Sequence, residues 1–442
     1  MKLVRPLSDV TTLISRGIAP KYTDERKTVV INQKCIREGQ VNLSLGRFHD
    51  HEIKGIPSSK IVSTKDILVN STGVGTLGRV AQVVYTDIEM TVDSHVTIVR
   101  PDTSAIDPDY LGAFMFLNQA SIEALGHGST GQTELSRHTL GELEVQLPSL
   151  GHQKFIGQLF QKIHKKIELN QKMNQTLEEI AKAIFKSWFV DFDPVLAKTE
   201  GRSTGLPPEI SDLFPDELSV SGIGEIPKGW ENKALGDHIA LIKGRSYKSA
   251  ELIDSDTALV TLKSFYRGGG YRFDGLKSYA GTFKAEQVVH EGDLIIALTD
   301  VTQAADVIGK PAIVRSSNQY QQLVASLDVG IIKVKDHSTL TKEFCYFLML
   351  SNRYTQHSLA YTSGTTVLHL AKDATANFDV TIPPTKLIDA FTEISSNMMQ
   401  RIFIAEKENQ ILSDLRDTLL PKLISGDLRI PDVEMFLEEA GI

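Results

Sequence analysis

The chain has 442 residues, of which 41% are hydrophobic and 23% are charged, and its formal net charge is −8. At roughly 150 residues per domain this length predicts two to four domains, and no apolar run approaches the roughly 20 residues of a membrane span. The N-terminal letters MKLVRPLSDVTTL lack the apolar stretch of a signal peptide, so we expect a cytoplasmic protein. Cys35 and Cys345 fit no metal or redox spacing, and we expect both to be small, reduced core residues.

The acidic net charge does not by itself exclude a nucleic-acid partner, because the acidic residues are concentrated in two segments. Residues 191–237 carry a charge of −6 and residues 427–442 carry −4, which leaves about +2 on the rest of the chain. Residues 241–280 hold seven bases against four acids. Local clusters, rather than the total charge, therefore decide whether the chain binds nucleic acid.

The first distinctive motif along the chain is the glycine-rich stretch LVNSTGVGTLGRVAQVVY, in which Gly73, Gly75 and Gly78 spell G-x-G-x-x-G. In a dinucleotide-binding loop a helix begins at the third glycine, so that free N–H groups face a pyrophosphate. Here the residues after Gly78 are rich in β-branched side chains, which favours a strand. We interpret the stretch as a turn between two strands, and a nucleotide-dependent enzyme that uses this loop stays as the alternative function.

Residues 1–150 alternate short β-branched runs with a few amphipathic segments. The pattern predicts a helix over residues 110–119 and strands at residues 61–62, 67–69, 80–85 and 95–99. This mixture indicates one α+β domain.

A long heptad pattern follows in residues 151–197. Ten positions with spacings of four and three form a mostly apolar seam, namely Ile156, Phe160, Ile163, Ile167, Asn170, Asn174, Leu177, Ala181, Ile184 and Trp188. We expect His164, which stands among lysines, to lie on the solvated face of this helix rather than to act as a general base. We expect Asp191 and Asp193 to form a turn or to contact a partner rather than to bind a metal.

The second half of the chain repeats the first. It begins after residues 198–229, an acidic segment rich in Pro, Gly and Ser that we interpret as an extended connector. In residues 230–384, LIIALTDVTQAADVIGKPAIV corresponds to the glycine stretch, with Gly309 opposite Gly78. Only the last of the three glycines is kept, which favours a turn of variable length over a cofactor loop.

A second heptad pattern occupies residues 385–426 and precedes an acidic tail, residues 427–442. Its seam is Phe391, Ser395, Met398, Ile402, Ala405, Asn409, Leu412, Arg416 and Leu419. We expect the two helices to pair and the seam asparagines Asn170, Asn174 and Asn409 to fix their register, with Asn174 and Asn409 bonded to each other. A helix of about 40 residues is roughly 60 Å long, so the pair is interpreted as a spacer.

Three segments beside the seams resemble a known family. IAKAIFKSWFVDFDPV (residues 180–195), GEIPKGW (224–230) and LRDTLLPKLISGDLRI (415–430) are similar to the conserved segments of the specificity subunit of type I restriction-modification enzymes. The resemblance spans the whole chain, including the repeat. It implies an α+β fold with two similar target recognition domains, each followed by a long helix, and the two helices paired as an antiparallel coiled coil.

The resemblance also implies a non-catalytic DNA reader within a larger enzyme. In this family each target recognition domain reads one part of a bipartite double-stranded DNA target, while the helices set the spacing and dock two methyltransferase subunits. We then expect no cofactor on this chain, with S-adenosylmethionine on the methyltransferase partner and ATP and Mg on the restriction partner. The sequence itself holds no Asp/Asn-Pro-Pro-aromatic methyltransferase signature, no P-loop and no H-E-x-x-H. A coiled-coil adaptor without DNA affinity stays as a further alternative.

Basic and aromatic residues alternate in clusters that we predict to contact DNA. In the second half, IKGRSYKS and LKSFYRGGGYRFDGLKSY include three consecutive glycines, which allow a close approach of the backbone. The predicted DNA-binding residues of this half are Lys243, Arg245, Tyr247, Lys248, Lys263, Arg267 and Arg272. Their counterparts in the first half are Arg16, Lys21, Tyr22, Arg37, Arg47, His49 and Arg79.

Overall fold

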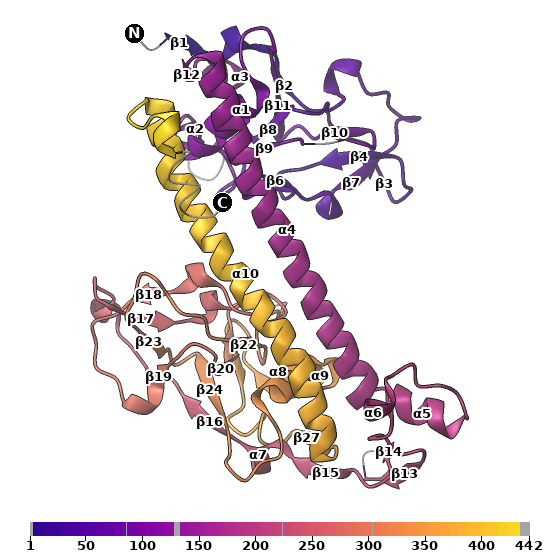
Figure 1. Cartoon of the computed structure of the whole chain (residues 1–442). Helices are drawn as coiled ribbons and strands as arrows, with labels where there is room; N and C mark the ends of the chain where they lie inside the picture. The colour runs from indigo at the N-terminus through magenta and orange to yellow at the C-terminus, as the bar shows by residue number, and fades with distance from the viewer. Residues whose placement is uncertain (1–2, 85, 128–132, 223, 303, 434–442) are drawn as a thin grey trace. The chain divides into compact units, whose positions relative to one another are not determined.

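The chain folds into two compact units, and two long helices take part in both of them (Figure 1). Unit 1 comprises Met1–Lys172 and Ala405–Ile442, and unit 2 comprises Met173–Ile404. The long helices are α4 (Leu150–Phe189) and α10 (Thr385–Ser425). The computed structural model describes residues 3–84, 86–127, 133–222, 224–302 and 304–433.

An antiparallel sheet of four strands forms the centre of unit 1, in the order β2-β11-β8-β9. Side chains alternate between its two faces: Ile67 and Val69 belong to a core shared with α1 and α4, whereas Leu68 belongs to a core shared with a second sheet. Because both faces are covered, β8 is buried along its whole length. The strands are β2 (Thr11–Arg16), β8 (Ile67–Asn70), β9 (Val80–Gln82) and β11 (Val96–Pro101).

The second sheet of unit 1 has the order β10-β4-β7-β3, and β10 runs parallel to β4. Its strands are β3 (Tyr22–Thr23), β4 (Thr28–Ile31), β7 (Arg47–His49) and β10 (Met90–Val92). The pairs β1–β12 and β5–β6 and three short helices complete the unit. Their bounds are β1 (Leu3–Pro6), β5 (Ile36–Arg37), β6 (Gln40–Val41), β12 (Glu144–Leu147), α1 (Pro108–Leu117), α2 (Gln119–Ala124) and α3 (Arg137–Gly141). Short 3-10 turns are η1 (Leu7–Val10), η2 (Leu43–Leu45) and η3 (Ser58–Lys60).

Unit 2 repeats this architecture. Its central sheet has the order β16-β24-β20-β22, and its second sheet contains the parallel pair β17 and β23 in place of β4 and β10. The strands of these sheets are β16 (Ile239–Lys243), β17 (Thr257–Val260), β18 (Lys277–Ser278), β19 (Val288–Val289), β20 (Leu294–Ala297), β22 (Pro311–Ile313), β23 (Gln322–Ala325) and β24 (Val329–Val334). The other elements are α7 (Leu235–His238), α8 (Lys342–Leu350), α9 (Asn352–Ala360), β15 (Glu231–Ala234), β21 (Thr299–Asp300), β25 (Thr362–Ser363), β26 (Leu368–Leu370), β27 (Asp379–Ile382), η4 (Ser249–Glu251), η5 (Leu262–Ser264), η6 (Phe273–Gly275) and η7 (Ala285–Gln287).

The predicted duplication is thus confirmed by the equal strand order of the two central sheets, and most of the predicted first-half elements are present. The predicted strands at 67–69 and 95–99 are β8 and β11, and the predicted helix is α1. The strand predicted at 80–85 ends at Gln82, which pairs with Ile67, the first residue of β8; residue 85 lies outside the described residues. Residues 61–62 form no strand, and Ile61 makes a single bridge to Thr91.

The glycine stretch forms a turn between the antiparallel strands β8 and β9, as predicted, and no helix begins at Gly78. Gly73, Gly75 and Gly78 have φ values of 101°, 70° and 82°. A Cβ atom on Gly78 would lie 2.8 Å from the backbone nitrogen of Glu123 in α2. The glycine pattern therefore reflects backbone conformation and close packing rather than a phosphate-binding loop.

The two long helices pair antiparallel along their seams. In unit 1, His164 of α4 contacts Arg416, while Asn170, further along α4, contacts Asn409, which is nearer the start of α10. The same end of α4 buries Ile156, Phe160, Ile163 and Ile167. In unit 2, Phe185, Phe189 and Trp188 pack around Phe391, with ring centroids 5.4, 5.3 and 6.4 Å from it.

The asparagine pairing differs from the prediction. Asn409 accepts a 2.9 Å hydrogen bond from Asn170, not from Asn174. Asn174 donates only a long bond of 3.4 Å to the Ile402 carbonyl, and its buried Oδ1 has no hydrogen-bond partner among the described residues. The reason is geometric: Asn174 and Asn409 correspond in the repeat, but corresponding residues of antiparallel helices do not in general face each other.

His164 does not lie on a solvated face, contrary to the prediction. Its side chain is 9% exposed and packs between Phe116 and Phe160, with centroid distances of 4.9 and 4.1 Å. Arg416 donates to its Nε2 at 3.2 Å. Burial and the Arg416 charge lower the pKa of His164 to about 3, so the imidazole is neutral.

The acidic connector is folded rather than extended. It contains α6 (Pro208–Ser211) and the hairpin β13 (Leu218–Ser221) and β14 (Gly224–Pro227), and α5 (Asp193–Thr199) precedes it. Its buried Phe214 lies 5.4 Å from Trp188 between ring centroids, so apolar anchors within an acidic, Pro-rich segment attach it to the core of unit 2. Asp191 pairs with Lys186, and Asp193 is the first residue of α5.

The cysteines, the helices and the acidic tail relate to the predictions made from composition. Both cysteines are buried, and burial raises the pKa of Cys345 to about 12. No helix within the described ranges is long and apolar enough to cross a membrane. Residues 434–442 of the acidic tail lie outside the described residues.

Candidate nucleic-acid interface

The first-half cluster is built around a stacked pair, Tyr22 and Arg47. These residues stand on the neighbouring strands β3 and β7, and the guanidinium carbon of Arg47 lies 3.5 Å from the centroid of the Tyr22 ring. Burial raises the pKa of the Tyr22 hydroxyl, which stays protonated and able to donate. A guanidinium stacked on an aromatic face keeps its N–H edge available for a base or a phosphate.

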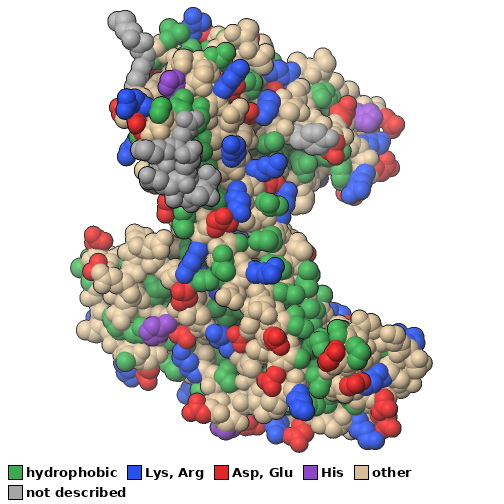
Figure 2. All heavy atoms as spheres, in the orientation of Figure 1, with side chains coloured by type: hydrophobic (Ala, Val, Ile, Leu, Met, Phe, Trp, Pro, Cys, Tyr) green, Lys and Arg blue, Asp and Glu red, His purple; other side chains and the backbone are tan. Residues whose placement is uncertain are grey.

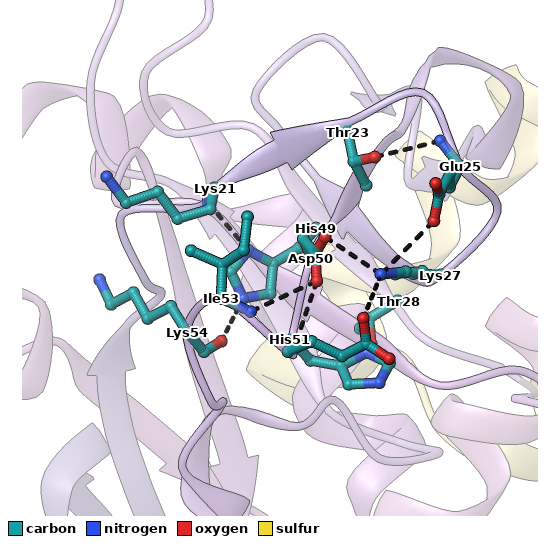
Figure 3. Close-up of polar contacts among 11 residues, drawn as sticks. Lys21, Thr23, Glu25, Lys27, Thr28, His49, Asp50, His51, Ile53 and Lys54 are labelled. Carbon is teal, nitrogen blue, oxygen red and sulfur yellow. Dashed lines mark hydrogen bonds and ion pairs between the residues drawn. The ribbon is translucent and has the colours of Figure 1, made fainter.

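His49 supports this cluster from inside and is not exposed to DNA. Its side chain is fully buried, its Nδ1 accepts the N–H of Lys21 at 2.8 Å, and its Nε2 lies 2.7 Å from the Lys54 carbonyl (Figure 3). Because a carbonyl only accepts, Nε2 carries the proton and both ring nitrogens are engaged. The structure therefore contradicts the prediction that His49 contacts DNA: on this strand the histidine faces the interior and fastens two loop segments.

Acidic residues beside the stacked pair neutralise one lysine but not the other. Lys27 lies 3.5 and 3.0 Å from the carboxylates of Glu25 and Asp50 (Figure 3) and 2.9 Å from that of Glu52. Hydrogen bonds to Glu52 and Asp50 raise the pKa of Lys27. The side chain of Lys21 is exposed. Lys21 is thus better placed than Lys27 to meet a phosphate.

The remaining first-half candidates are scattered. Arg37 is exposed on β5. Arg79 is half-buried and braces the glycine turn by donating to the Gly75 carbonyl at 2.8 Å. Arg16, at the end of β2, donates to the Leu135 carbonyl at 2.6 Å and pairs with Glu134 at 2.7 Å. The structure therefore brings together only Lys21, Tyr22, Arg47 and the buried His49.

Unit 2 contains a second cation over a tyrosine ring, formed by Tyr247 and Lys277. Lys277 Nζ lies 5.8 Å from the Tyr247 centroid. The strand registers show that Lys277 stands opposite Leu259, as Arg47 stands opposite Val30 in unit 1. Lys277 was not among the predicted residues. Matching the basic positions of the two copies along the sequence would have found it.

The other second-half candidates are mostly surface residues. Lys243, Lys248 and Lys263 are exposed, whereas Arg245 is half-buried and donates its backbone N–H to Ala325 at 2.7 Å. They come from three separate segments: the end of β16 and the residues after it, the turn η4, and the turn η5.

The triple-glycine loop is a tight turn with one projecting arginine. The N–H groups of Gly268 and Gly270 donate to the carbonyls of Asp306 and Pro311, both at 2.9 Å. The Arg267 side chain is 79% exposed and lies 3.7 Å from the Asp306 carboxylate. Arg272 Nε is bonded to Asp274 at 2.9 Å, so Arg267 is the more available of the two.

The visible faces of both units mix basic and acidic side chains (Figure 2). Local ion pairing therefore decides which cations are available for an anion. Among the described residues, no group of three or more His, Cys, Asp or Glu side chains is placed to hold a metal ion.

Comparisons with known proteins identify the family. The family model described as the type I restriction modification DNA specificity domain matches residues 3–179 and 227–402. The specificity subunit of the type I restriction enzyme HindI from Haemophilus influenzae is 24% identical over 430 residues, covering 85% of this chain and 90% of that protein. The MjaIX specificity subunit from Methanocaldococcus jannaschii is 26% identical over 333 residues, covering 72% of this chain and 69% of that protein.

A solved structure shows the same fold. The crystal structure of the S subunit of a type I restriction-modification system from M. genitalium superposes with a TM-score of 0.57 at 14% identity, covering 96% of both chains. The two family-model matches coincide with the two copies seen in the sheets and together include well over half of the chain. The chain therefore belongs to the type I restriction-modification DNA specificity family and carries the domain of that family twice.

Proposed function

We propose that the chain is the non-catalytic DNA-reading subunit of a type I restriction-modification complex, with each half reading one part of a bipartite duplex target. The observation that carries the proposal is the duplication: two copies of one specificity domain with the same central strand order. Two similar readers in one chain suit a target with two separated parts. In this proposal the reading domains are residues 1–150 and 230–384.

The contacts that support reading are the stacked cations and the projecting arginine. Arg47 over Tyr22 in unit 1, and Lys277 beside Tyr247 in unit 2, each combine a cation with an aromatic face at an exposed or half-exposed site. Arg267 adds a guanidinium at the tip of a rigid turn. Guanidinium groups can bond guanine edges in the major groove or phosphates, so these residues are our candidates for direct contact.

The helices, residues 151–197 and 385–426, serve in this proposal as the spacer and as the docking surface for partners. The antiparallel seam and the Asn170–Asn409 bond give the pair a defined register. Two methyltransferase subunits would bring S-adenosylmethionine, and a restriction subunit would bring ATP and Mg. In this proposal the methyltransferase and restriction activities belong to those partner subunits and not to this chain.

Mapping methylated adenines in the genome of cells that carry the complex tests the spacer. Removing one heptad from both helices together should change the distance between the two half-sites and leave their sequences intact. As a control, removing seven residues from one helix alone should misalign Asn170 and Asn409 and weaken assembly. Unchanged spacing after the paired deletion would show that the helices do not set the distance.

Single arginine variants test the division between the halves. Arg267→Ala should weaken recognition of one half-site only, by about 1–3 kcal/mol if the side chain makes a bidentate base contact. Arg272→Ala should have a smaller effect, because Asp274 already holds that guanidinium. Relaxation of both half-sites in either variant would contradict the assignment of one half-site to each domain.

A further inference from the structure

Unit 1 contains an open cleft of about 980 Å³ at the end of β2, beside α3. Arg16, Lys60 and Arg137 line it together with the carboxylates of Glu134 and Glu142. Arg16 is fastened to the Leu135 carbonyl and to Glu134, whereas the Arg137 side chain is exposed. Arg137 was not among the residues predicted from the sequence.

Three cations line this cleft, and hydrogen bonds hold Lys60 among them. Lys60 Nζ donates to Ser15 Oγ at 2.5 Å and to the Arg16 carbonyl, which fixes it beside β2. Burial lowers the pKa of Lys60, and the like charge of Arg137 lowers it further. An anion between them would relieve this repulsion.

Unit 2 has a smaller cleft, of about 220 Å³, at the equivalent place, the end of β16. It is lined by Lys243 and Lys372, which correspond to Arg16 and Arg137 at offsets of 227 and 235 residues. Backbone bonds fix this correspondence. Gly17 and Gly244, which follow the first cation of each pair, donate to the Val96 and Val329 carbonyls, at 3.1 and 3.0 Å.

The segment that precedes the second cation is also held in the same way in both copies. Leu135 donates to the Ser71 carbonyl and Leu370 to the Leu298 carbonyl, each at 2.9 Å. The two donors are 235 residues apart and the two acceptors are 227 residues apart. These are the same offsets that relate Lys372 to Arg137 and Lys243 to Arg16. The two clefts are therefore one feature present twice, with a basic residue kept at both positions.

We infer that these paired clefts are the sites where each domain holds a backbone phosphate of duplex DNA, through Arg16 and Arg137 in the first copy and Lys243 and Lys372 in the second. The inference rests on the proposed DNA-reading function and adds that each domain binds phosphates and reads bases with different residues. Contacts to phosphates carry no sequence information, so two domains that read different half-sites can share them. Residues that read bases must differ between two domains that read different half-sites.

Charge-neutral variants of Arg137 and Lys372 test the inference, because Arg16 is part of the local fold and Lys243 is the last residue of β16. Arg137→Gln and Lys372→Gln should each lower the affinity of the assembled methyltransferase complex about 3- to 10-fold, equally for the mapped bipartite duplex and for a scrambled duplex. Each should reduce the slope of log affinity against log salt by about one unit. Arg137→Lys and Lys372→Arg keep the charge and should restore most of the affinity, and thermal denaturation should be unchanged.

A matched control is Lys284→Gln, at a lysine whose side chain is 77% exposed and which lies outside both clefts and outside the long helices, and it should leave the affinity and salt slope unchanged. An unaltered affinity in Arg137→Gln and Lys372→Gln, with the wild type still selecting its bipartite target, would overturn the inference and leave the proposed function standing. A changed half-site preference in either variant would also overturn it, since the cation would then read bases. Absence of duplex binding by the wild-type complex would defeat both.

A free nucleotide is the other source of phosphate that such a cleft could bind. Titration of the full chain with ATP distinguishes it from DNA. We expect no saturable binding, because two carboxylates share the first cleft with its cations. Saturable ATP binding that is lost in Arg137→Gln would assign the cleft to a nucleotide and overturn the inference.

Discussion

The turn after β8 and the turn after β20 occupy the same place in the two copies, yet they are built differently. The first uses three glycines with positive φ, of which Gly73 and Gly75 shape the turn itself. The second is longer, and the Asp300 carboxylate stabilises it by accepting the N–H groups of Thr302 and Val307 at 2.8 Å each. In the second copy the Asp300 carboxylate thus shapes the turn that Gly73 and Gly75 shape in the first copy.

The one glycine that both turns keep is fixed by packing rather than by the turn. Gly78 and Gly309 donate equivalent bonds, to the carbonyls of Asn70 and Ala297, both at 2.9 Å. A Cβ atom would lie 2.8 Å from Glu123 in the first copy and 2.6 Å from Ser358 in the second. Glu123 and Ser358 are themselves equivalent, at the offset of 235. Comparison of the two copies therefore distinguishes residues that the fold requires from residues that can vary.

The largest effect that we expect from this comparison is on the kept glycine. Gly78→Ala should lower the free energy of unfolding by about 3 kcal/mol, because it adds the cost of a left-handed backbone to an overlap with the Glu123 backbone. Gly75→Ala, which also has positive φ but meets open space, should cost only about 1 kcal/mol. Urea titration followed by circular dichroism measures both. Equal losses would mean that packing against α2 contributes nothing.

A second difference between the copies predicts sensitivity to acid. His164 occupies the position that Met399 has in the second helix, at the offset of 235. The folded-state pKa of His164, about 3, lies below its ordinary value of about 6.5, so the unfolded chain binds the proton more tightly. The stability that depends on the neutral imidazole is complete above the ordinary value and is lost as pH falls below it.

Between pH 7.5 and pH 5 this single group should therefore cost about 2 kcal/mol of unfolding free energy. His164→Met makes the first helix like the second and should remove that part of the loss. His138→Gln, at a histidine whose side chain is 86% exposed, should not. Identical pH profiles for the wild type and His164→Met would refute a neutral, buried His164.

The contrast between the two histidines predicted to be accessible, His49 and His164, shows where sequence reasoning ends. The repeat, the heptad seams, the β8–β9 turn and the α+β class all follow from patterns within a segment. The burial of His164 depends on Phe116 and Arg416, and that of His49 on its contacts with Lys21 and Lys54, which no local pattern reveals. Likewise, a repeat offset identifies residues that correspond, not residues that touch, so the Asn170–Asn409 bond required coordinates.

The site was predictable to a similar degree. Basic and aromatic composition led to Tyr22, Arg47 and Tyr247, which do take part in cation–aromatic pairs. Composition could not show that Arg79 braces a turn or that Arg272 is held by Asp274. Arg137 and Lys372 escaped because they stand outside the dense clusters, whereas Lys277 lies within one and was passed over. A comparison of charge between equivalent positions of the two copies would have revealed them.

A third prediction uses the unequal asparagines of the two helices. Ala405 stands at the repeat position of Asn170, so Asn170→Ala makes the first helix like the second. This change should lower the free energy of unfolding by about 1–2 kcal/mol, since it removes the bonds that Asn170 donates to Asn409 and to the Glu408 carboxylate at a position that is 3% exposed. Asn174→Ala should change it by less than about 0.5 kcal/mol, because its Oδ1 has no partner among the described residues and its donated bond is long. Denaturant titration measures the free energy of unfolding of both variants. A larger loss of this free energy for Asn174→Ala would show that Asn174, and not Asn170, stabilises the helix pair.

The smallest expected effect separates the two cation–tyrosine pairs. Arg47 lies 3.5 Å from the Tyr22 ring centroid, whereas Lys277 lies 5.8 Å from that of Tyr247, near the limit of about 6 Å for a cation–π contact. Double-mutant cycles with Arg47→Gln and Tyr22→Leu, and with Lys277→Gln and Tyr247→Leu, isolate each coupling energy. We expect about 0.5–1 kcal/mol for the first pair, as at other exposed sites, and a value near zero for the second. If both couplings vanish in the free protein while DNA binding still falls when either partner is changed, the pairs act in recognition alone. A stronger coupling in the second pair would show that the distance from the cation to the ring does not govern the strength of these contacts.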